Sequence, residues 1–396
     1  MSEKYEIGQG KGVHGRCMPG YEAMVDAFAD TIARGLEVGA ACAVFKDGIP
    51  VLDLWGGVVD RRAGTPWRED TLVTVYSVTK GVAALSILHL VDQGLLELDQ
   101  PVARYWPEFA VHGKQDVTVR ELLGHRAGLP FVEGEIALDE LASPAHMAAR
   151  LAAQAPHFAP GTTHMYHGLT IGWLTSELVR RVTGQSMGPW VAAMARRLGV
   201  ELWIGLPQEL RPRVALLDVQ APEQRTLLRD FYPVGSVGWK VVTLNGLVEP
   251  MPGDGGLDFN DYKLQSKELA GANLTTNARS LAKFYDSCLE QPGRQAFVSA
   301  RTIADASRPV STGVPFDSPV PGASWGAGLM IPFSVQPMLG PASFGHDGYG
   351  GSLAFADPES GVSFAYVRNQ LAPGGAKDET VYRMVDGLKN ILKGSA

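Results

Sequence analysis

The N-terminal part of the chain has the pattern of one helix followed by strands. Apolar residues recur with the helical period over Tyr21–Leu36, which predicts an amphipathic helix. Two strand-like runs follow at Ala40–Phe45 and Val51–Trp55, and the polar turn Lys46-Asp47-Gly48 between them predicts a hairpin. The β-branched run Thr71–Tyr76 indicates a further strand, which ends directly before a serine.

The middle of the chain is predominantly helical in pattern. Gly81–Val91 is apolar on nearly every side, which favours a buried helix over a surface helix. Most segments from there to about Leu198 have helical patterning interrupted by Gly and Pro. Residues from about Pro207 to Asp261 mix Pro, Gly and short apolar runs, so we expect an irregular segment there. A long loop of this kind is often functional.

Strands return near the C-terminus, before a final helix at about Lys377–Leu392. The turn Asp357–Gly361 joins the last two strands. Strands at both ends of the chain and helices between them predict one sheet built from both termini, with a helical domain inserted. The four C-terminal β-leaning runs are Gly328–Phe333, Ala342–Gly345, Ser352–Ala356 and Val362–Val367.

Composition indicates a globular protein. The 396 residues exceed the usual size of one hydrophobic core, so one large domain or two interlocked domains are expected. Apolar residues make up 45% of the chain and charged residues 19%, which is typical of a folded protein. The net charge of −7 and the lack of a strongly basic segment argue against nucleic acid as a partner.

Cysteine usage and the N-terminal segment favour the cytoplasm. The three cysteines, Cys17, Cys42 and Cys288, have neither metal-type nor disulfide-framework spacing, which fits a reducing compartment. The N-terminal residues lack the apolar stretch of a signal peptide, and no window is apolar enough to span a bilayer. The nine histidines show no clustered ligand spacing, so we expect no metal.

Ser77-Val-Thr-Lys80 is the first candidate for catalysis. On a helix, residues three apart share a face, so the Ser77 hydroxyl and the Lys80 amine can meet. A serine needs a base to become a nucleophile, and burial lowers the pKa of a lysine enough to make it one. The helix N-terminus would favour a developing oxyanion. The pattern alone leaves open that Ser77 is an ordinary helix N-cap.

Two other motif matches are expected to be coincidences. Ser280-Leu-Ala-Lys283 repeats the S-x-x-K form inside an amphipathic helical pattern capped near Thr276, and we expect it to lie on the surface. Gly184-Gln-Ser-Met-Gly188 matches the nucleophile elbow G-x-S-x-G, which requires a preceding strand. Here the preceding residues Ile171–Val182 are helical in pattern, and Gly184 is placed to end that helix.

Around Tyr76-Ser-Val-Thr-Lys-Gly81 the chain resembles the serine β-lactamase and penicillin-binding-protein superfamily, most of all the class C β-lactamases and family VIII carboxylesterases. The likeness spans most of the chain. The resemblance implies a β-lactamase-like fold of the α/β class: an antiparallel sheet flanked by helices, with an inserted helical domain. Residues 1–78 and 320–396 would form the α/β sandwich domain, and residues 79–319 a mainly helical domain with an irregular insertion near 207–261. The supporting stretches are Leu90-Val-Asp-Gln-Gly-Leu-Leu-Glu-Leu-Asp99, Leu122-Leu-Gly-His-Arg-Ala-Gly-Leu-Pro130, Tyr166-His-Gly168 and Phe344-Gly-His-Asp-Gly-Tyr-Gly-Gly-Ser352.

The resemblance also implies a second catalytic group. The family's Tyr-x-Asn motif is matched by Tyr166-His167-Gly168, which makes Tyr166 the expected proton shuttle between Ser77 and the leaving group. Gly168 stands where the family has Asn. That Asn would hold Lys80 and bind the side-chain amide of a β-lactam, so Gly168 changes the substrate-binding wall.

A third motif completes the expected site. The family's Lys-Thr-Gly is matched by His346-Asp347-Gly348, which makes His346 and Gly348 expected substrate-binding residues on one wall of the cleft. The small Gly348 permits close approach of the backbone to the substrate. The backbone N–H groups of Tyr349 and Ser77 are the expected oxyanion hole.

The expected function is that of a serine carboxylesterase that hydrolyses small carboxylic esters through an acyl-enzyme on Ser77, without a cofactor. Alternatives within the same chemistry are an acyltransferase, a β-lactamase and a peptidase. An alternative from another class is a non-catalytic binding or sensor module. Retention of Ser77, Lys80 and Tyr166 together argues against that last alternative.

Overall fold

The computed structural model describes residues 5–6, 12–219, 230, 232–253, 255–316, 321–336, 338–372 and 379–394. Within these residues the largest element is a ten-stranded sheet in the order β1-β2-β4-β3-β14-β13-β12-β11-β10, with β5 added beside β4. Every neighbouring pair in it is antiparallel, as expected. The strands are β1 (Tyr5–Glu6), β2 (Val13–Cys17), β3 (Gly39–Lys46), β4 (Ile49–Asp60), β5 (Thr65–Pro66), β10 (Ser324–Trp325), β11 (Met330–Ile331), β12 (Phe344–Asp347), β13 (Leu353–Asp357) and β14 (Val362–Arg368).

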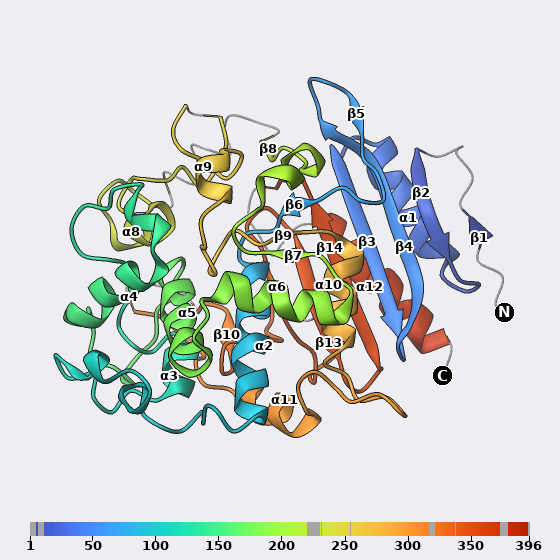
Figure 1. The fold of residues 1–396 in the computed structure, drawn as a ribbon. Helices are drawn as coiled ribbons and strands as arrows, with labels where there is room; N and C mark the ends of the chain where they lie inside the picture. Colours follow the sequence, from blue (N-terminus) through green and yellow to red (C-terminus); the bar gives the residue numbers. More distant parts are fainter. Residues whose placement is uncertain are drawn as a thin grey trace.

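The sheet joins the two ends of the chain through β3 and β14, which pair over seven residues from Lys46↔Val362 to Ala40↔Arg368. The predicted hairpin is β3–β4, and the predicted turn at 357–361 joins β13 to β14. Figure 1 shows the sheet on one side of the molecule, the helices α3, α4, α5 and α8 on the other, and α2 between them. The helices are α1 (Glu22–Ala33), α2 (Val78–Asp92), α3 (Val119–Leu123), α4 (Pro144–Ala153), α5 (Thr170–Thr183), α6 (Met187–Leu198), α8 (Val237–Thr243), α9 (Tyr262–Gln265), α10 (Ala278–Asp286), α11 (Ala300–Ala306) and α12 (Glu379–Gly394).

Side-chain alternation along the central strands divides the core into two parts. On one face, large residues such as Phe364 and Tyr366 pack with α1 and α12. On the other face, small residues such as Ala43 and Ala365 belong to the core that contains α2 and α10. Successive residues of a strand point to opposite faces, so this alternation lets α10 approach the backbone of β3, β13 and β14 closely.

The domain boundaries at 78/79 and 319/320 stay a prediction. Helix α10 lies within the segment 79–319 that we expected to be the helical domain, yet it packs on the sheet. Helices from both predicted segments therefore pack on the sheet. No described helix has the length and apolarity that a bilayer span requires.

The structure corrects several predicted element bounds. The predicted strand Thr71–Tyr76 is reduced to β6 (Val73–Thr74), because Tyr76 has a φ of 47° and leaves the extended conformation. The segment 207–261 is not wholly irregular, since it contains α8; its residues 220–229, 231 and 254 lie outside the described part of the chain. The final helix was expected to begin at about Lys377. Helix α12 is described from Glu379, and residues 377–378 lie outside the described part of the chain. The remaining short elements are β7 (Leu202–Trp203), β8 (Asp218–Val219), β9 (Thr275–Thr276), β15 (Gln370–Leu371) and the 3-10 helices Val102–Arg104, Pro107–Ala110, Glu140–Ala142 and Gln208–Arg213.

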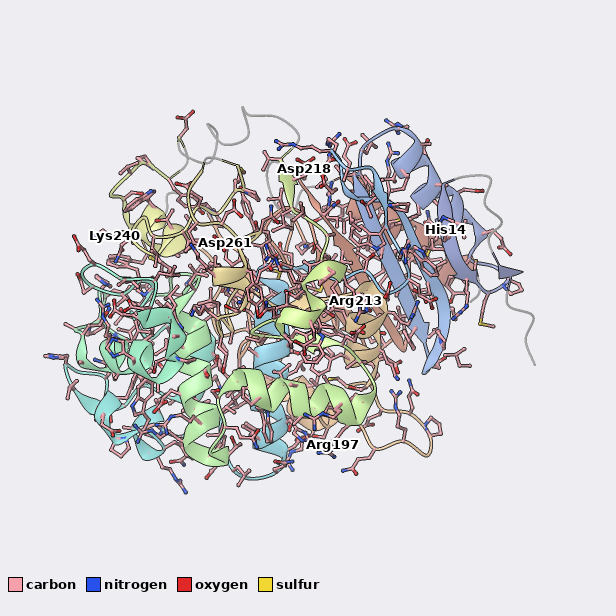
Figure 2. All side chains as sticks on the ribbon, turned by 45° about the horizontal axis from the view of Figure 1, so that its top comes forward. His14, Arg197, Arg213, Asp218, Lys240 and Asp261 are labelled. Atoms are coloured by element: carbon pink, nitrogen blue, oxygen red, sulfur yellow. The ribbon has the colours of Figure 1, made fainter. Side chains whose placement is uncertain are left out.

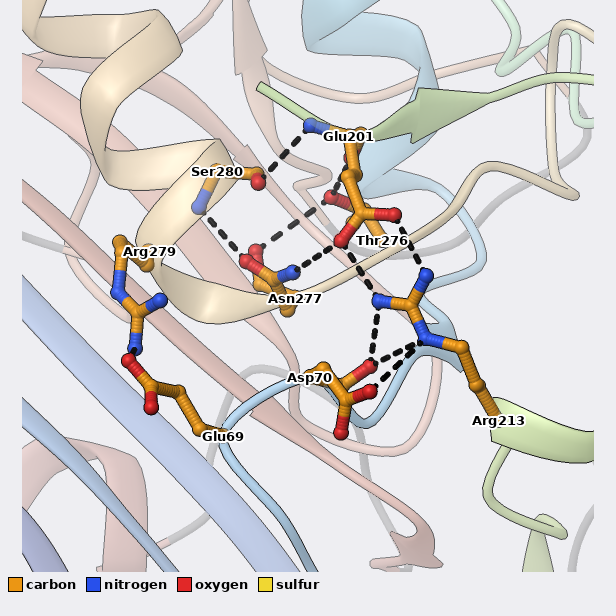
Figure 3. A network of polar contacts seen from close by, with 8 residues as sticks. All are labelled: Glu69, Asp70, Glu201, Arg213, Thr276, Asn277, Arg279 and Ser280. Carbon is orange, nitrogen blue, oxygen red and sulfur yellow. Dashed lines mark hydrogen bonds and ion pairs between the residues drawn. The ribbon is translucent and has the colours of Figure 1, made fainter. Parts of the chain in front are cut away.

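A polar network fixes the backbone that leads to Ser77. Strand β6 pairs with β9, and β9 pairs with β7, in a small three-stranded sheet. Beside it, the Arg213 guanidinium donates to the Glu201 carboxylate and to the Asp70 carbonyl, each at 2.7 Å, as Figure 3 shows. Asn277, the N-cap of α10, also donates to Glu201 at 3.4 Å. The network ties the residues before β6 to β7 and to the start of α10.

Candidate active site

Ser77 is the residue directly before α2. In the described structure its side chain makes no capping hydrogen bond to the first turn of that helix. Its Oγ instead lies 3.0 Å from the Nζ of Lys80, one turn along the helix. The geometry therefore differs from that of an ordinary N-cap serine, whose oxygen accepts from the N2 or N3 amide.

Tyr76 holds Ser77 at a sharp bend of the chain. Its φ of 47° lies in the left-handed region, which a bulky aromatic residue rarely adopts. The Tyr76 hydroxyl donates to the Pro250 carbonyl at 3.0 Å, and its ring packs edge-on against Phe259 and Tyr349 at centroid distances of 4.9 and 5.6 Å. Strain of this kind is found at functional sites and persists where the surroundings enforce it. No sequence signal at Tyr76 indicated the bend.

Lys80 is buried, with 4% of the residue exposed. Burial lowers its pKa to about 7, and the nearby Asp347 carboxylate opposes this shift. Besides Ser77, its Nζ has a partner in the carbonyl oxygen of Gly271 at 2.5 Å. A neutral amine can donate to Gly271 and accept the Ser77 proton at once, so the arrangement suits a general base near neutral pH.

Tyr166 lies beside both Ser77 and Lys80. Burial raises the pKa of its phenol well above the usual range, although a hydrogen bond with the Ser77 side chain opposes that shift. The Lys80 Nζ lies 4.7 Å from the centroid of the Tyr166 ring, and Trp325 stacks on the ring at 5.4 Å. The phenol is therefore protonated at neutral pH, which suits a proton relay better than a free phenolate base.

Gly168, which stands where the family has Asn, is packed against Val241. A Cβ added at Gly168 would lie 2.7 Å from Cγ1 of Val241, which belongs to α8. Val241 therefore occupies the space that an Asn side chain at position 168 would need. The Lys80 amine, which that Asn would hold, has the Gly271 carbonyl as its partner. Sequence reasoning missed both Val241 and Gly271, because each is far from Ser77 in the sequence.

The end of β12 lies against the segment that leads to Ser77. A Cβ at Gly348 would overlap the carbonyl oxygen of Val75, so only glycine lets the two backbones approach this closely. Within the described chain, neither the Ser77 N–H nor the Tyr349 N–H has a hydrogen-bond acceptor. Both donors are thus available to an oxyanion, as the family resemblance implies.

His346 has a different position from the one we expected. It is 1% exposed and is not among the described residues that line the cavity beside Ser77, whereas Gly168, Gly348 and Tyr349 are. Its Nδ1–H donates to the Asp347 carbonyl at 2.6 Å, and among the described residues its Nε2 has no partner. Burial lowers the pKa of His346 to about 3, so the ring is neutral. The titratable residue of this motif that lines the cavity is Asp347, whose side chain is 20% exposed and which sequence reasoning did not select.

The cavity beside Ser77 has a volume of about 420 Å³ and is mainly apolar. None of its described lining residues is Lys or Arg. One wall comes from α8 and from the chain before α9; Figure 2 shows Lys240 of α8 and Asp261, the N-cap of α9, on the same side of the molecule. The polar lining residues include Ser77, Tyr166, His164 and Asp347, and the apolar ones include Leu169, Val241, Phe259, Trp325, Met330 and Phe333.

The two rival serines have structural partners. Ser186 is the N-cap of α6, follows helix α5 as expected, and donates to the Glu268 carboxylate at 2.8 Å. Gly184 ends α5 with a φ of 78°, which confirms its predicted role. Ser280 is buried and not on the surface, which corrects that expectation: its hydroxyl accepts from the Glu201 N–H at 3.0 Å.

Comparison with known proteins identifies the family. A family model described as Beta-lactamase matches residues 28–388. The chain belongs to the β-lactamase family. It is 34% identical over 375 residues to the esterase/β-lactamase LipL of Mycobacterium tuberculosis, a match that covers 91% of this chain and 84% of LipL. The predicted resemblance and fold are confirmed.

Solved structures with the same fold cover nearly the whole chain. A structure described as a family VIII carboxylesterase has a TM-score of 0.81 and 32% identity, and the match covers 96% of this chain and 99% of that one. A penicillin-binding protein homologue from Caulobacter crescentus has a TM-score of 0.83 and 34% identity, with the same coverage of both chains. Among the described residues, no group of three or more His, Cys, Asp or Glu side chains could hold a metal ion.

Proposed function

We propose that the protein is a serine carboxylesterase that hydrolyses small carboxylic esters through an acyl-enzyme on Ser77. The observation that carries this proposal is the contact of Ser77 with both Lys80 and Tyr166 on the wall of an apolar cavity. The names of similar proteins support it, since LipL is named an esterase and one similar structure is described as a carboxylesterase. An uncharged ester needs only this triad of side chains, the oxyanion donors and an apolar wall.

In the proposed acylation step, neutral Lys80 accepts the proton of the Ser77 hydroxyl. The Ser77 Oγ attacks the ester carbonyl carbon, and the backbone N–H groups of Ser77 and Tyr349 stabilise the resulting oxyanion. The carbon–oxygen bond to the alcohol then breaks. Tyr166 protonates the departing alcohol oxygen and recovers a proton from the Lys80 ammonium, which leaves an ester on Ser77 and neutral Lys80.

The proposed deacylation step repeats this chemistry with water. A water molecule attacks the acyl carbon and its proton passes through Tyr166 to Lys80. The bond between the acyl carbon and Ser77 Oγ breaks, and Ser77 recovers the proton. An acyltransferase would differ only in the nucleophile, which would be an alcohol or an amine. The apolar cavity lets such a nucleophile compete with water, so acyl transfer is the second candidate function.

Esters should be much better substrates than cephalosporins. A cephalosporin carries a carboxylate, and the cavity gives that group no cationic partner: His346 is buried and neutral, and the described lining has neither Lys nor Arg. Gly168, packed against Val241, also lacks the amide for the β-lactam side chain. An unpaired desolvated charge costs several kcal/mol, so we expect specificity constants that differ by roughly a hundredfold or more.

The test compares kcat/KM for a short-chain aryl ester and a chromogenic cephalosporin on one preparation. Comparable values, or a preference for the cephalosporin, would overturn the esterase assignment and favour β-lactamase activity.

The pH dependence of kcat/KM should show the titration of Lys80. Burial lowers the pKa of this amine to about 7, and only its neutral form can accept the Ser77 proton. For an uncharged ester, kcat/KM should fall about tenfold per pH unit below this pKa and level off above it. The measurement is kcat/KM between pH 5 and 9 at constant ionic strength. A flat profile through pH 7 would exclude Lys80 as the base.

We propose a cytoplasmic location. The three cysteines Cys17, Cys42 and Cys288 all lie in the described part of the chain, where they are buried and form no disulfide. Unpaired thiols are typical of a reducing compartment.

A further inference from the structure

Asp347 carries the charge of the substrate cavity. It is the last residue of β12, it lines the cavity, and its side chain is 20% exposed. The side chain of Gln336 donates a hydrogen bond to its carboxylate. The Gln336 Oε1 in turn accepts from the Tyr382 hydroxyl of α12 at 2.9 Å. The carboxylate is therefore held in place from a neighbouring helix and is not a free surface group.

The other titratable groups near Asp347 are uncharged when the site is competent for catalysis. Lys80 must be neutral to act as a base, and burial keeps the pKa values of His346 and His125 below their usual range. His164, which also lines the cavity, has a lowered pKa for the same reason. The Tyr166 phenol is protonated.

Asp347 itself is ionised under mildly alkaline conditions. Burial raises its pKa to about 6, while Lys80 opposes the shift. At pH 8 the described part of the site therefore has one net negative charge, and that charge belongs to Asp347.

The remaining lining favours cations over anions for an independent reason. Trp325, Phe333 and Tyr349 are aromatic residues of its lining. The face of an aromatic ring attracts cations, including quaternary ammonium groups, and repels anions. With neither Lys nor Arg in the described lining, nothing offsets this preference.

We propose that Asp347 selects substrates by charge, so that the cavity disfavours esters that carry a carboxylate and favours esters that carry an ammonium group. This inference rests on the proposed esterase function and names its substrate class. In a cavity of about 420 Å³, a bound substituent lies within the range of about 10 Å over which a charge acts at 0.1 M salt. Asp347 therefore repels a carboxylate and attracts an ammonium group whichever end of the ester carries that group.

The test uses three 4-nitrophenyl esters whose acyl chains have equal length and end in a methyl, a carboxylate or a trimethylammonium group. At pH 8 the wild-type protein should have its highest kcat/KM for the ammonium ester and its lowest for the carboxylate ester. Asp347→Asn keeps the shape of the side chain and removes its charge. It should raise the carboxylate-to-methyl ratio of kcat/KM by roughly tenfold or more and lower the ammonium-to-methyl ratio.

Asp258→Asn is the matched control. Asp258 precedes Phe259 of the cavity but does not itself line the cavity, and its carboxylate accepts from the Asn260 N–H at 2.7 Å, which an amide oxygen can also do. Because Asp258 lies outside the lining, its two ratios should shift much less than those of Asp347→Asn. Unchanged ratios in Asp347→Asn, or equal shifts in both variants, would overturn the proposal for Asp347. Failure of the wild-type protein to hydrolyse the methyl-terminated ester would instead overturn the esterase function.

Discussion

Replacing Ser77 by alanine should reduce ester hydrolysis by a factor on the order of 10⁴ or more while the protein stays folded. Ser77 makes no capping bond in the described structure, so the loss of its hydroxyl should not destabilise α2. Lys80→Ala should cause a similar loss, because members of one catalytic unit are not additive. The measurement is kcat/KM with a short-chain aryl ester, together with thermal unfolding of each variant.

Ser186→Ala is the control for this experiment. Its hydroxyl is bonded to the Glu268 carboxylate at the start of α6, so the variant should lose some stability but keep turnover within a few-fold of wild type. A folded Ser77→Ala protein with near wild-type turnover would contradict the assignment of the nucleophile.

Tyr166→Phe should lower kcat by about a hundredfold to ten-thousandfold and leave KM nearly unchanged. The ring, which stacks on Trp325, is kept, and only the hydroxyl that bonds Ser77 is lost. A group that moves protons acts in the transition state and contributes little to substrate binding, which explains the split between kcat and KM. Steady-state kinetics with the aryl ester measure both constants.

Tyr285→Phe provides a matched control for Tyr166→Phe. Tyr285 is buried beside α2, and its hydroxyl has no hydrogen-bond partner in the described part of the chain. Loss of that hydroxyl should leave kcat unchanged. An equal and small effect of both variants would remove Tyr166 from the mechanism and leave Lys80 as the only proton carrier.

The sequence predicted those features of the site that depend on local spacing. Ser77 and Lys80 are three residues apart on a helix, so their approach follows from helix geometry alone. The apolar run after them predicted that Lys80 would be buried, and α2 is buried along nearly its whole length. The strands near both termini were also recognisable, because β3, β4, β13 and β14 have strong β-type patterns.

Features that depend on contacts between distant segments were not predictable. The Gly271 carbonyl reaches Lys80 from 191 residues away, and Val241 closes the space beside Gly168. Neither residue belongs to a motif. The predicted substrate-binding role of His346 stays a prediction: the described lining contains the next residue, Asp347, and not His346, because neighbouring residues of a strand point in opposite directions. The left-handed turn at Tyr76 likewise depends on its tertiary contacts with Pro250 and Phe259.

Mass spectrometry of the intact protein tests the central claim most directly. The protein is mixed with an aryl ester or a fluorophosphonate, quenched in acid, weighed and digested to locate the adduct. We expect one covalent adduct per chain, located on the peptide that contains Ser77, and no adduct on the Ser77→Ala protein. An adduct on another residue such as Ser186, or the same adduct on the Ser77→Ala protein, would contradict the proposed acyl-enzyme.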